Sequence, residues 1–278
     1  MRTVYLGTSA FAAAILERLA ETTHRPALVV TRPDAPKGRG RAVSPPPVAE
    51  AARGLGLELD QPASVNDDTA RERIAAAQPD ALIVCAFGAL IKEPLLSDHE
   101  ILNVHPSLLP RWRGAAPVER AIMAGDAETG VSIMRLTAGL DAGPVCLAAS
   151  EPIRADDTYG SLAQRLQGLS ADLLIRALDE RPPFAEQDEA GVTYAEKIGP
   201  QDRTLDLSRP AVENERIVRA LTPHIGARIE LPGGQFLGVR AARATDSGLE
   251  LLEVQPAGGR PMAYADYVRG HGAVAGAA

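Results

Sequence analysis

Residues 1–31 read MRTVYLGTSAFAAAILERLAETTHRPALVVT, and this stretch decides the fold. Residues 3–6 are apolar and partly β-branched, and Gly7 ends the run, which predicts a buried strand. Apolar side chains then recur at helical spacing over 11–19, and 27–31 is a second strand of the buried type. A strand, a helix and another strand in this order predict a βαβ unit with parallel strands.

The alternation continues to about residue 180. Further strands are predicted at 81–86, 101–104 and 131–136, and further helices at 48–55, 70–77, 118–124 and 158–178. Alternating strands and helices predict an α/β fold with a mostly parallel sheet covered by helices on both faces. In such sheets the ligand site lies beyond the carboxyl ends of the strands. The residues that directly follow strands are therefore the first candidates for chemistry.

The pattern changes after residue 180, where Arg181-Pro182-Pro183 ends the long helix. A helix at 212–221 is followed by short strands at 227–231, 236–242 and 249–254, and by a closing helix at 264–269. Glycine-containing turns separate these strands. We predict a catalytic domain at 1–180, a linker at 181–208, a small β-rich domain at 209–270 and a disordered Gly/Ala-rich tail at 271–278.

Composition narrows the class of protein. The chain has 278 residues, enough for two domains and a large core. Lys and Arg number 29 against 36 Asp and Glu, so the formal charge of −7 argues against a generic nucleic-acid coat but allows a local basic patch.

Two further features concern the compartment. Cys85 and Cys146 are too few for a tetrahedral zinc site, and they favour a reducing compartment over a disulfide framework. No apolar run is long enough to cross a bilayer, and residues 1–7 lack the layout of a signal peptide. We expect a cytoplasmic protein with no membrane partner.

The densest group of polar side chains lies in NVHPSLLPRWRG at 103–114. Asn103 and His105 stand two residues apart at a strand end, so their side chains share one face. Buried polar groups are costly unless they have partners or a function. A hydrogen-bonded histidine at the end of a strand is the alternative interpretation. Three prolines and a glycine within a dozen positions of His105 predict a stiff loop.

Two other segments are candidates. AGLDAGP at 138–144 is a glycine-rich turn with Asp141 at its centre, and an ordinary turn is the alternative. TRPDAPKGRGR at 31–41 carries four cations against one acid, and its Pro and Gly residues argue against a regular element. A solvated surface loop is the alternative to an Arg-rich finger that binds phosphates.

Taken in order, these residues resemble the methionyl-tRNA formyltransferase family. The segments similar to the family are GTSAFA at 7–12, RPDAPKGRG at 32–40, NVHPSLLPRWRGAAP at 103–117, GDAETGVSIM at 125–134, GLDAG at 139–143, VTYAEKI at 192–198 and LLEVQPAG at 251–258. They span nearly the whole chain. The pattern N-x-H…D is shared by all folate-dependent formyltransferases, whereas the basic loop, RGAAP and the C-terminal domain distinguish this family.

Three departures from the family are visible. Ser9 replaces the usual proline, the stretch between Arg243 and Leu249 is shorter, and LTPHIGA at 221–227 stands where the family usually has N-P-W-P-G-A. The resemblance therefore implies a Rossmann-like formyltransferase domain followed by a small OB-like domain that looks shortened.

The resemblance also implies the reaction. The formyl group of 10-formyltetrahydrofolate, a co-substrate, would pass to the α-amino group of methionyl-initiator-tRNA in translation initiation, with no metal and no obligate protein partner. The implied catalytic residues are Asn103, His105 and Asp141; the implied folate-binding residues are Ser107, Leu108, Leu109, Pro110, Phe87, Gly88 and Leu90; the implied tRNA-binding residues are Lys37, Arg39 and Arg41. How His105 and Asp141 divide the base and oxyanion roles stays open.

Three alternatives remain at this stage. The same chemistry could use a small acceptor, such as an amino-sugar nucleotide or glycinamide ribonucleotide. Water could be the acceptor, which would make the protein a hydrolase. A catalytically silent RNA-binding module is the alternative outside the enzymes.

Overall fold

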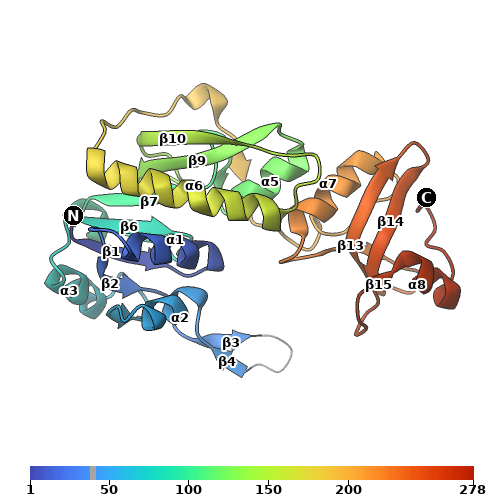
Figure 1. Ribbon diagram of the computed structural model, residues 1–278, viewed down its shortest axis with the longest axis horizontal. Helices are drawn as coiled ribbons and strands as arrows, with labels where there is room; N and C mark the ends of the chain where they lie inside the picture. Colours follow the sequence, from blue (N-terminus) through green and yellow to red (C-terminus); the bar gives the residue numbers. More distant parts are fainter. Residues whose placement is uncertain (38–41) are drawn as a thin grey trace. The chain divides into compact units, whose positions relative to one another are not determined.

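The computed structural model describes residues 1–37 and 42–278 of the chain, and Figure 1 shows their course. Two compact units are present. The first comprises Met1–Arg113, Gly130–Glu151 and Gln164–Thr193, and the second comprises Gly114–Thr129, Pro152–Ala163 and Tyr194–Ala278. These units alternate along the chain, whereas the sequence predicts contiguous domains at 1–180 and 209–270. The predicted domain boundaries remain a prediction about which segments of the chain fold independently.

A seven-stranded sheet forms the centre of the α/β part. Its strands run in the order β10 (Val145–Pro152), β9 (Glu128–Arg135), β7 (Ile101–His105), β6 (Ala81–Cys85), β1 (Thr3–Gly7), β2 (Pro26–Val30) and β5 (Leu59–Asp60). The pairs formed by β1, β2, β5, β6 and β7 are parallel, and β9 pairs antiparallel with β7. The predicted mostly parallel α/β sheet is confirmed.

Every residue of β1, β6 and β7 is buried, as the continuous apolar runs predict for strands covered on both faces. The helices of this part are α1 (Ala10–Ala20), α2 (Pro47–Gly54), α3 (Asp68–Ala76), α4 (Leu95–Asp98) and α6 (Tyr159–Glu180). In Figure 1, α1 and α6 lie on the same face of the sheet, and Arg18 of α1 donates to Asp172 of α6 at 2.8 Å. Within the described residues, no helix is both long and apolar enough to cross a bilayer.

Ser9, one of the departures from the family pattern, has a clear local role. It is the N-cap of α1, and its side chain accepts a hydrogen bond from the backbone N–H of Ala12. Serine is among the preferred N-cap residues because its oxygen satisfies a donor that the first turn leaves free. The substitution therefore supports the start of α1 directly after β1.

The prediction that 31–41 holds no regular element is wrong for its middle. Residues Ala35–Lys37 form β3, which pairs antiparallel with β4 (Ala42–Ser44). These two strands make a sheet of their own. Each is an edge strand, and an edge strand tolerates a proline whose missing N–H would face outward. Pro36 is therefore compatible with the ribbon.

The second unit contains the predicted β-rich region. After α7 (Ala211–Leu221), strands β12 (Ala227–Glu230), β13 (Phe236–Thr245), β14 (Gly248–Gln255) and β15 (Met262–Ala263) form an antiparallel sheet in chain order. The unit also holds α5 (Pro117–Ala124) and α8 (Tyr264–His271), while the short strands β8 (Arg113–Gly114) and β11 (Tyr194–Ala195) pair with each other. A two-residue connection, Asp246-Ser247, joins β13 to β14.

The tail differs from the prediction of disorder. The backbone N–H of Ala278 donates to Leu249 O at 3.0 Å, and Val274 is buried in the apolar cluster beneath the antiparallel sheet. The Gly/Ala composition hides this packing because few apolar residues carry it: Val274 is buried in the cluster, and Ala277 packs against it. Leu249, Leu251 and Val254 of β14 belong to the same cluster.

Candidate active site

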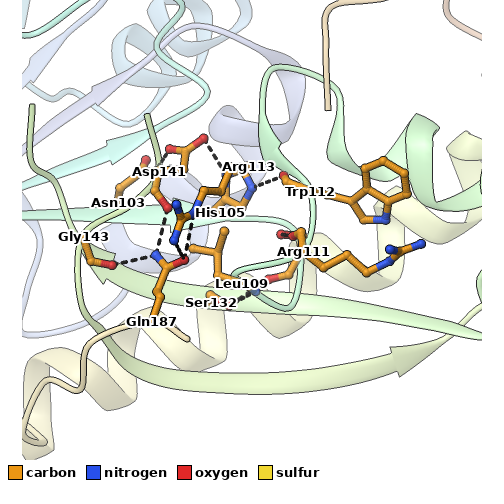
Figure 2. Close-up of polar contacts among 11 residues, drawn as sticks. Asn103, His105, Leu109, Arg111, Trp112, Arg113, Ser132, Asp141, Gly143 and Gln187 are labelled. Carbon is orange, nitrogen blue, oxygen red and sulfur yellow. Dashed lines mark hydrogen bonds and ion pairs between the residues drawn. The ribbon is translucent and has the colours of Figure 1, made fainter. Parts of the chain in front are cut away.

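The three side chains of the N-x-H…D pattern meet at one place, and Figure 2 shows them together. Asn103 and His105 point the same way from the end of β7 because alternate residues of a strand share a face. Asp141 comes from the segment 136–144 between β9 and β10. That segment folds back over β7, so a carboxylate from a distant part of the sequence reaches both side chains.

The carboxylate of Asp141 contacts each partner with a different oxygen. Asn103 Nδ2 donates to Asp141 Oδ1 at 3.3 Å, and His105 Nδ1 lies 3.6 Å from Asp141 Oδ2. The side chain of His105 is 5% exposed and that of Asp141 is 13% exposed. Interactions between charges are stronger in such a partly water-excluded place than at an open surface.

The contact of His105 Nε2 shows which nitrogen of the neutral ring carries the hydrogen. His105 Nε2 lies 2.9 Å from the backbone oxygen of Trp112, and a carbonyl oxygen only accepts, so Nε2 carries the hydrogen and donates. In the neutral ring, Nδ1 then presents a lone pair toward Asp141. In the doubly protonated ring, Nδ1 forms an ion pair with the carboxylate 3.6 Å away. The pair can therefore accept a proton at Nδ1 without moving.

The loop after His105 is held by two buried serines. Ser107 Oγ donates to Arg111 O at 2.6 Å, while Ser132 Oγ donates to Ser107 O and accepts from Leu109 N. Ser107 is fully buried, so its hydroxyl fixes the loop from inside. Leu108, Leu109 and Pro110 are half-buried. These hydrogen bonds are a second reason, besides the prolines, to expect a rigid loop. Binding of folate by Ser107–Pro110 stays a prediction.

The other predicted folate segment follows β6. The Thr8 hydroxyl donates to Phe87 O at 2.7 Å, Phe87 is buried, and Gly88 takes a positive φ of 72°. Leu90 is 68% exposed, so its apolar side chain is accessible to a ligand. Because β6 and β7 are parallel neighbours, their carboxyl ends face the same edge of the sheet. A folate role for these residues stays a prediction.

The predicted tRNA residues are not tested by the fold. Lys37 is the last residue of β3, and Arg39 and Arg41 lie outside the described residues. Their role in binding tRNA remains a prediction.

Two residues near Asp141 were not singled out from the sequence. Arg113 is buried, although it belongs to the quoted motif at 103–117, and it contacts Gln187. Gln187 lies in the polar segment after α6, where no local pattern distinguishes it from its neighbours. Only the long-range contacts show that this segment reaches the candidate site.

The two thiols are free, and neither has the character of an activated nucleophile. Burial raises the pKa of Cys85 to about 12. Burial also raises the pKa of Cys146, whose thiol donates to Ile133 O at 3.4 Å. Reactive cysteines instead have a lowered pKa. The polar groups that meet at the candidate site are the amide of Asn103, the imidazole of His105 and the carboxylate of Asp141, and their catalytic role stays a prediction.

Comparison with known proteins gives consistent matches. Residues 1–178 match the family described as formyl transferase. The methionyl-tRNA formyltransferase of Halorhodospira halophila (strain DSM 244 / SL1) is 42% identical over 305 residues, covering 99% of this chain and 98% of the relative.

Solved structures share the fold. Methionyl-tRNA formyltransferase from Clostridium thermocellum superposes with a TM-score of 0.68 at 14% identity, covering 92% of this chain and 98% of that chain. HypX from Aquifex aeolicus in complex with tetrahydrofolic acid gives a TM-score of 0.66 at 17% identity, covering 96% of this chain and 47% of that one. From the sequence matches, the chain belongs to the methionyl-tRNA formyltransferase family of one-carbon transferases.

Proposed function

We propose that this chain transfers the formyl group of 10-formyltetrahydrofolate to the α-amino group of methionyl-initiator-tRNA, in the cytoplasm, at the start of translation. The observation that carries the proposal is the contact of Asp141 with both Asn103 and His105 at the end of β7. The full-length relative that is 42% identical carries the corresponding name.

The reaction requires a neutral amine to attack the formyl carbon, which forms a C–N bond and a tetrahedral intermediate with a negative oxygen. The bond between that carbon and the folate nitrogen then breaks, the amine loses a proton and the folate nitrogen gains one. Such a reaction is accelerated by alignment, by a donor to the oxyanion and by a path for the proton.

The side chains of the site match these requirements. Asn103 supplies N–H donors without a charge that must be desolvated. His105 can hold a proton at Nδ1 while Nε2 stays bound to Trp112 O, and Asp141 stabilises the resulting imidazolium. The same pair can return the proton to the leaving nitrogen. Asp141 acting through water on the amine is the alternative division of roles.

The folate would lie against the half-buried side chains at 108–110 and the exposed Leu90. A flat ring system binds well on a rigid apolar surface with a few polar groups at its edge. The HypX structure with tetrahydrofolic acid supports a folate as the ligand of this fold.

Three arginines of the second unit support a polyanionic acceptor. Burial lowers the pKa of Arg203, and the positive charges of the nearby Arg228 and Arg240 lower it further. Their hydrogen bonds go to neutral oxygens, those of Ile225, Thr204 and Gln255 among them. Within the described part of the chain, none of the three forms an ion pair with a carboxylate. A phosphodiester of tRNA would relieve this repulsion. The phosphate of a nucleotide acceptor would relieve it too, so the arginines argue against water as the acceptor and not against a nucleotide.

The test is a choice of acceptors. We expect the purified chain to consume 10-formyltetrahydrofolate and to label methionyl-initiator-tRNA much faster than elongator methionyl-tRNA. Equal or faster formylation of an amino-sugar nucleotide would refute the proposed acceptor. Consumption of the formyl donor that ignores every added amine would indicate hydrolysis, and failure to bind the folate would indicate a silent RNA-binding module.

A further inference from the structure

The amide nitrogen of Gln187 donates both of its hydrogens to backbone oxygens beside the candidate site. Gln187 Nε2 donates to Asp141 O at 2.8 Å and to Gly143 O at 2.7 Å, as Figure 2 shows. A primary amide has two N–H donors, and these contacts use both. The glutamine thus holds the main chain at Asp141 and two residues beyond it.

The opposite end of the same amide is held by a buried cation. Arg113 donates to Gln187 Oε1 from Nε at 3.0 Å and from Nη2 at 2.9 Å, and Nη2 also donates to Glu189 at 2.9 Å. Arg113 is 3% exposed, so its guanidinium is a fixed anchor. Because arginine only donates, the oxygen of the amide must face Arg113 and the nitrogen must face the two carbonyls.

The segment that Gln187 holds has a conformation in need of support. Asp141 has φ +45°, a left-handed conformation that costs free energy for a residue with a Cβ. Gly143 passes so close to β9 that an added Cβ would lie 2.0 Å from Arg135 O. The carboxylate reaches Asn103 and His105 only while the main chain keeps this path.

We propose that Gln187 is a positioning residue for formyl transfer, which acts by fixing the Asp141 turn from behind through the chain Arg113–Gln187–Asp141. This inference rests on the proposed function, because it assigns Asp141 to the chemistry. Gln187 touches neither Asn103 nor His105 through any hydrogen bond in the described structure, so its effect on the reaction passes through the backbone of 141–143.

The sharpest variant is Gln187→Glu. The carboxylate is nearly isosteric with the amide and keeps the two acceptor contacts to Arg113. It replaces the donating nitrogen with an oxygen that faces the oxygens of Asp141 and Gly143, so both bonds are lost and repulsion takes their place. Misplacing a catalytic group by about 1 Å can cost roughly 10²-fold, so we expect kcat to fall by about 10- to 100-fold with KM for both substrates within about twofold.

A double-mutant cycle separates positioning from general damage. If Gln187 acts through the carboxylate of Asp141, then in the Asp141→Asn background Gln187→Glu should cost less than about threefold. A cost in that background equal to the cost in wild type would overturn the proposal, as would wild-type kcat in Gln187→Glu or an effect on KM alone. Glu186→Gln, one residue earlier and exposed, is the matched control and should retain wild-type kcat.

A measurement without substrates keeps the test independent of the proposed function. In the ligand-free chain, amide hydrogens of the peptide 136–144 should exchange about tenfold faster in Gln187→Glu than in wild type, because the segment opens more easily. Unchanged exchange would overturn the clamp. If the glutamate variant does not fold, Gln187→Ala replaces it in both measurements; there water can reach the two carbonyls, so we expect a smaller loss of kcat and a similar rise in exchange.

If wild type formylates no acceptor, the proposed function fails while the exchange experiment still decides whether Gln187 holds the turn. If wild type transfers formyl rapidly but exchange is unchanged in the Gln187 variant, the proposed function stands and the clamp fails. The two failures are therefore distinguishable.

Discussion

Replacing Asp141 with asparagine should abolish most of the transfer activity while leaving the fold intact. Asparagine has the same shape and is among the residues that tolerate positive φ, so the turn at φ +45° is preserved. The change removes one negative charge that lies 3.6 Å from His105 Nδ1. The variant therefore isolates the electrostatic contribution of the carboxylate.

The magnitude follows from that distance. At 3.6 Å, Coulomb's law gives about 4.6 kcal/mol with an effective dielectric constant of about 20 and about 1.2 kcal/mol in bulk water. Because about 1.4 kcal/mol corresponds to a tenfold change in rate, the limits are roughly 10-fold and roughly 10³-fold. Both side chains are largely buried, at 5% and 13% exposed, so we expect a loss of about 10²- to 10³-fold in kcat.

The assay is single-turnover formyl transfer to methionyl-initiator-tRNA at saturating 10-formyltetrahydrofolate, which reports the chemical step. Asp98→Asn, which removes an exposed carboxylate at the end of α4, is the control and should react at the wild-type rate. Folding of each variant is checked by thermal unfolding. A folded Asp141→Asn protein that transfers formyl within threefold of wild type would refute the reasoning.

Four further outcomes are expected. Asn103→Ala should lower kcat by at least about 10²-fold, the scale for losing an oxyanion donor, and near-normal turnover of folded protein would exclude that role. Arg240→Gln should weaken binding of tRNA without changing folate affinity and should reduce the slope of log affinity against log salt by about one; an unchanged slope would place the phosphates elsewhere. The hydrogen bond from Arg120, 2.8 Å long, lowers the pKa of Asp202 below its usual 3.8. This pair therefore stabilises the fold above pH 3.8, and the contribution disappears as the pH falls through the lowered value. In urea unfolding, Asp202→Asn should be less stable than wild type at pH 7, and the difference should shrink steadily as the pH falls below 3.8; a difference that stays constant in acid would contradict this sign. Gly130→Ala should destabilise the protein by about 1–3 kcal/mol, because its Cβ would lie 2.2 Å from Ala149 O and 2.6 Å from Leu108 Cδ2, and an unchanged free energy of unfolding would show that the loop gives way.

Local patterns were sufficient for most of the regular elements. The apolar run at 3–6 became β1, and the helical spacing over 11–19 became α1. Buried strands and amphipathic helices carry their signal within a few neighbouring residues, because side-chain periodicity follows directly from backbone geometry. The same holds for the end of β7, where two polar residues at a spacing of two stood out against an apolar strand.

What the sequence could not reveal depends on contacts between distant segments. Among the described residues, β3 and β4 pair with each other alone, and Pro36 inside β3 masks the strand character of 35–37. Gln187 is one polar residue among several, and its importance comes from Arg113, 74 positions earlier, and from the turn at Asp141. The packing of residues 271–278 also escapes composition, since it depends on contacts of Val274 and Ala277 with a cluster formed by distant residues. Composition and periodicity describe neighbouring residues only, so they cannot predict contacts between distant segments.

The hydrogen bond that His105 makes to the main chain has a consequence for variation at position 112. The imidazole of His105 donates to the backbone oxygen of Trp112 and not to its indole. Replacing the tryptophan side chain therefore leaves the hydrogen-bond acceptor of His105 in place. The backbone there has φ +64°, so glycine or asparagine would suit it without strain. A side-chain mutation at position 112 therefore leaves the hydrogen of the neutral imidazole on Nε2. The side chain at this position can change to fit an incoming molecule without altering the tautomer of His105.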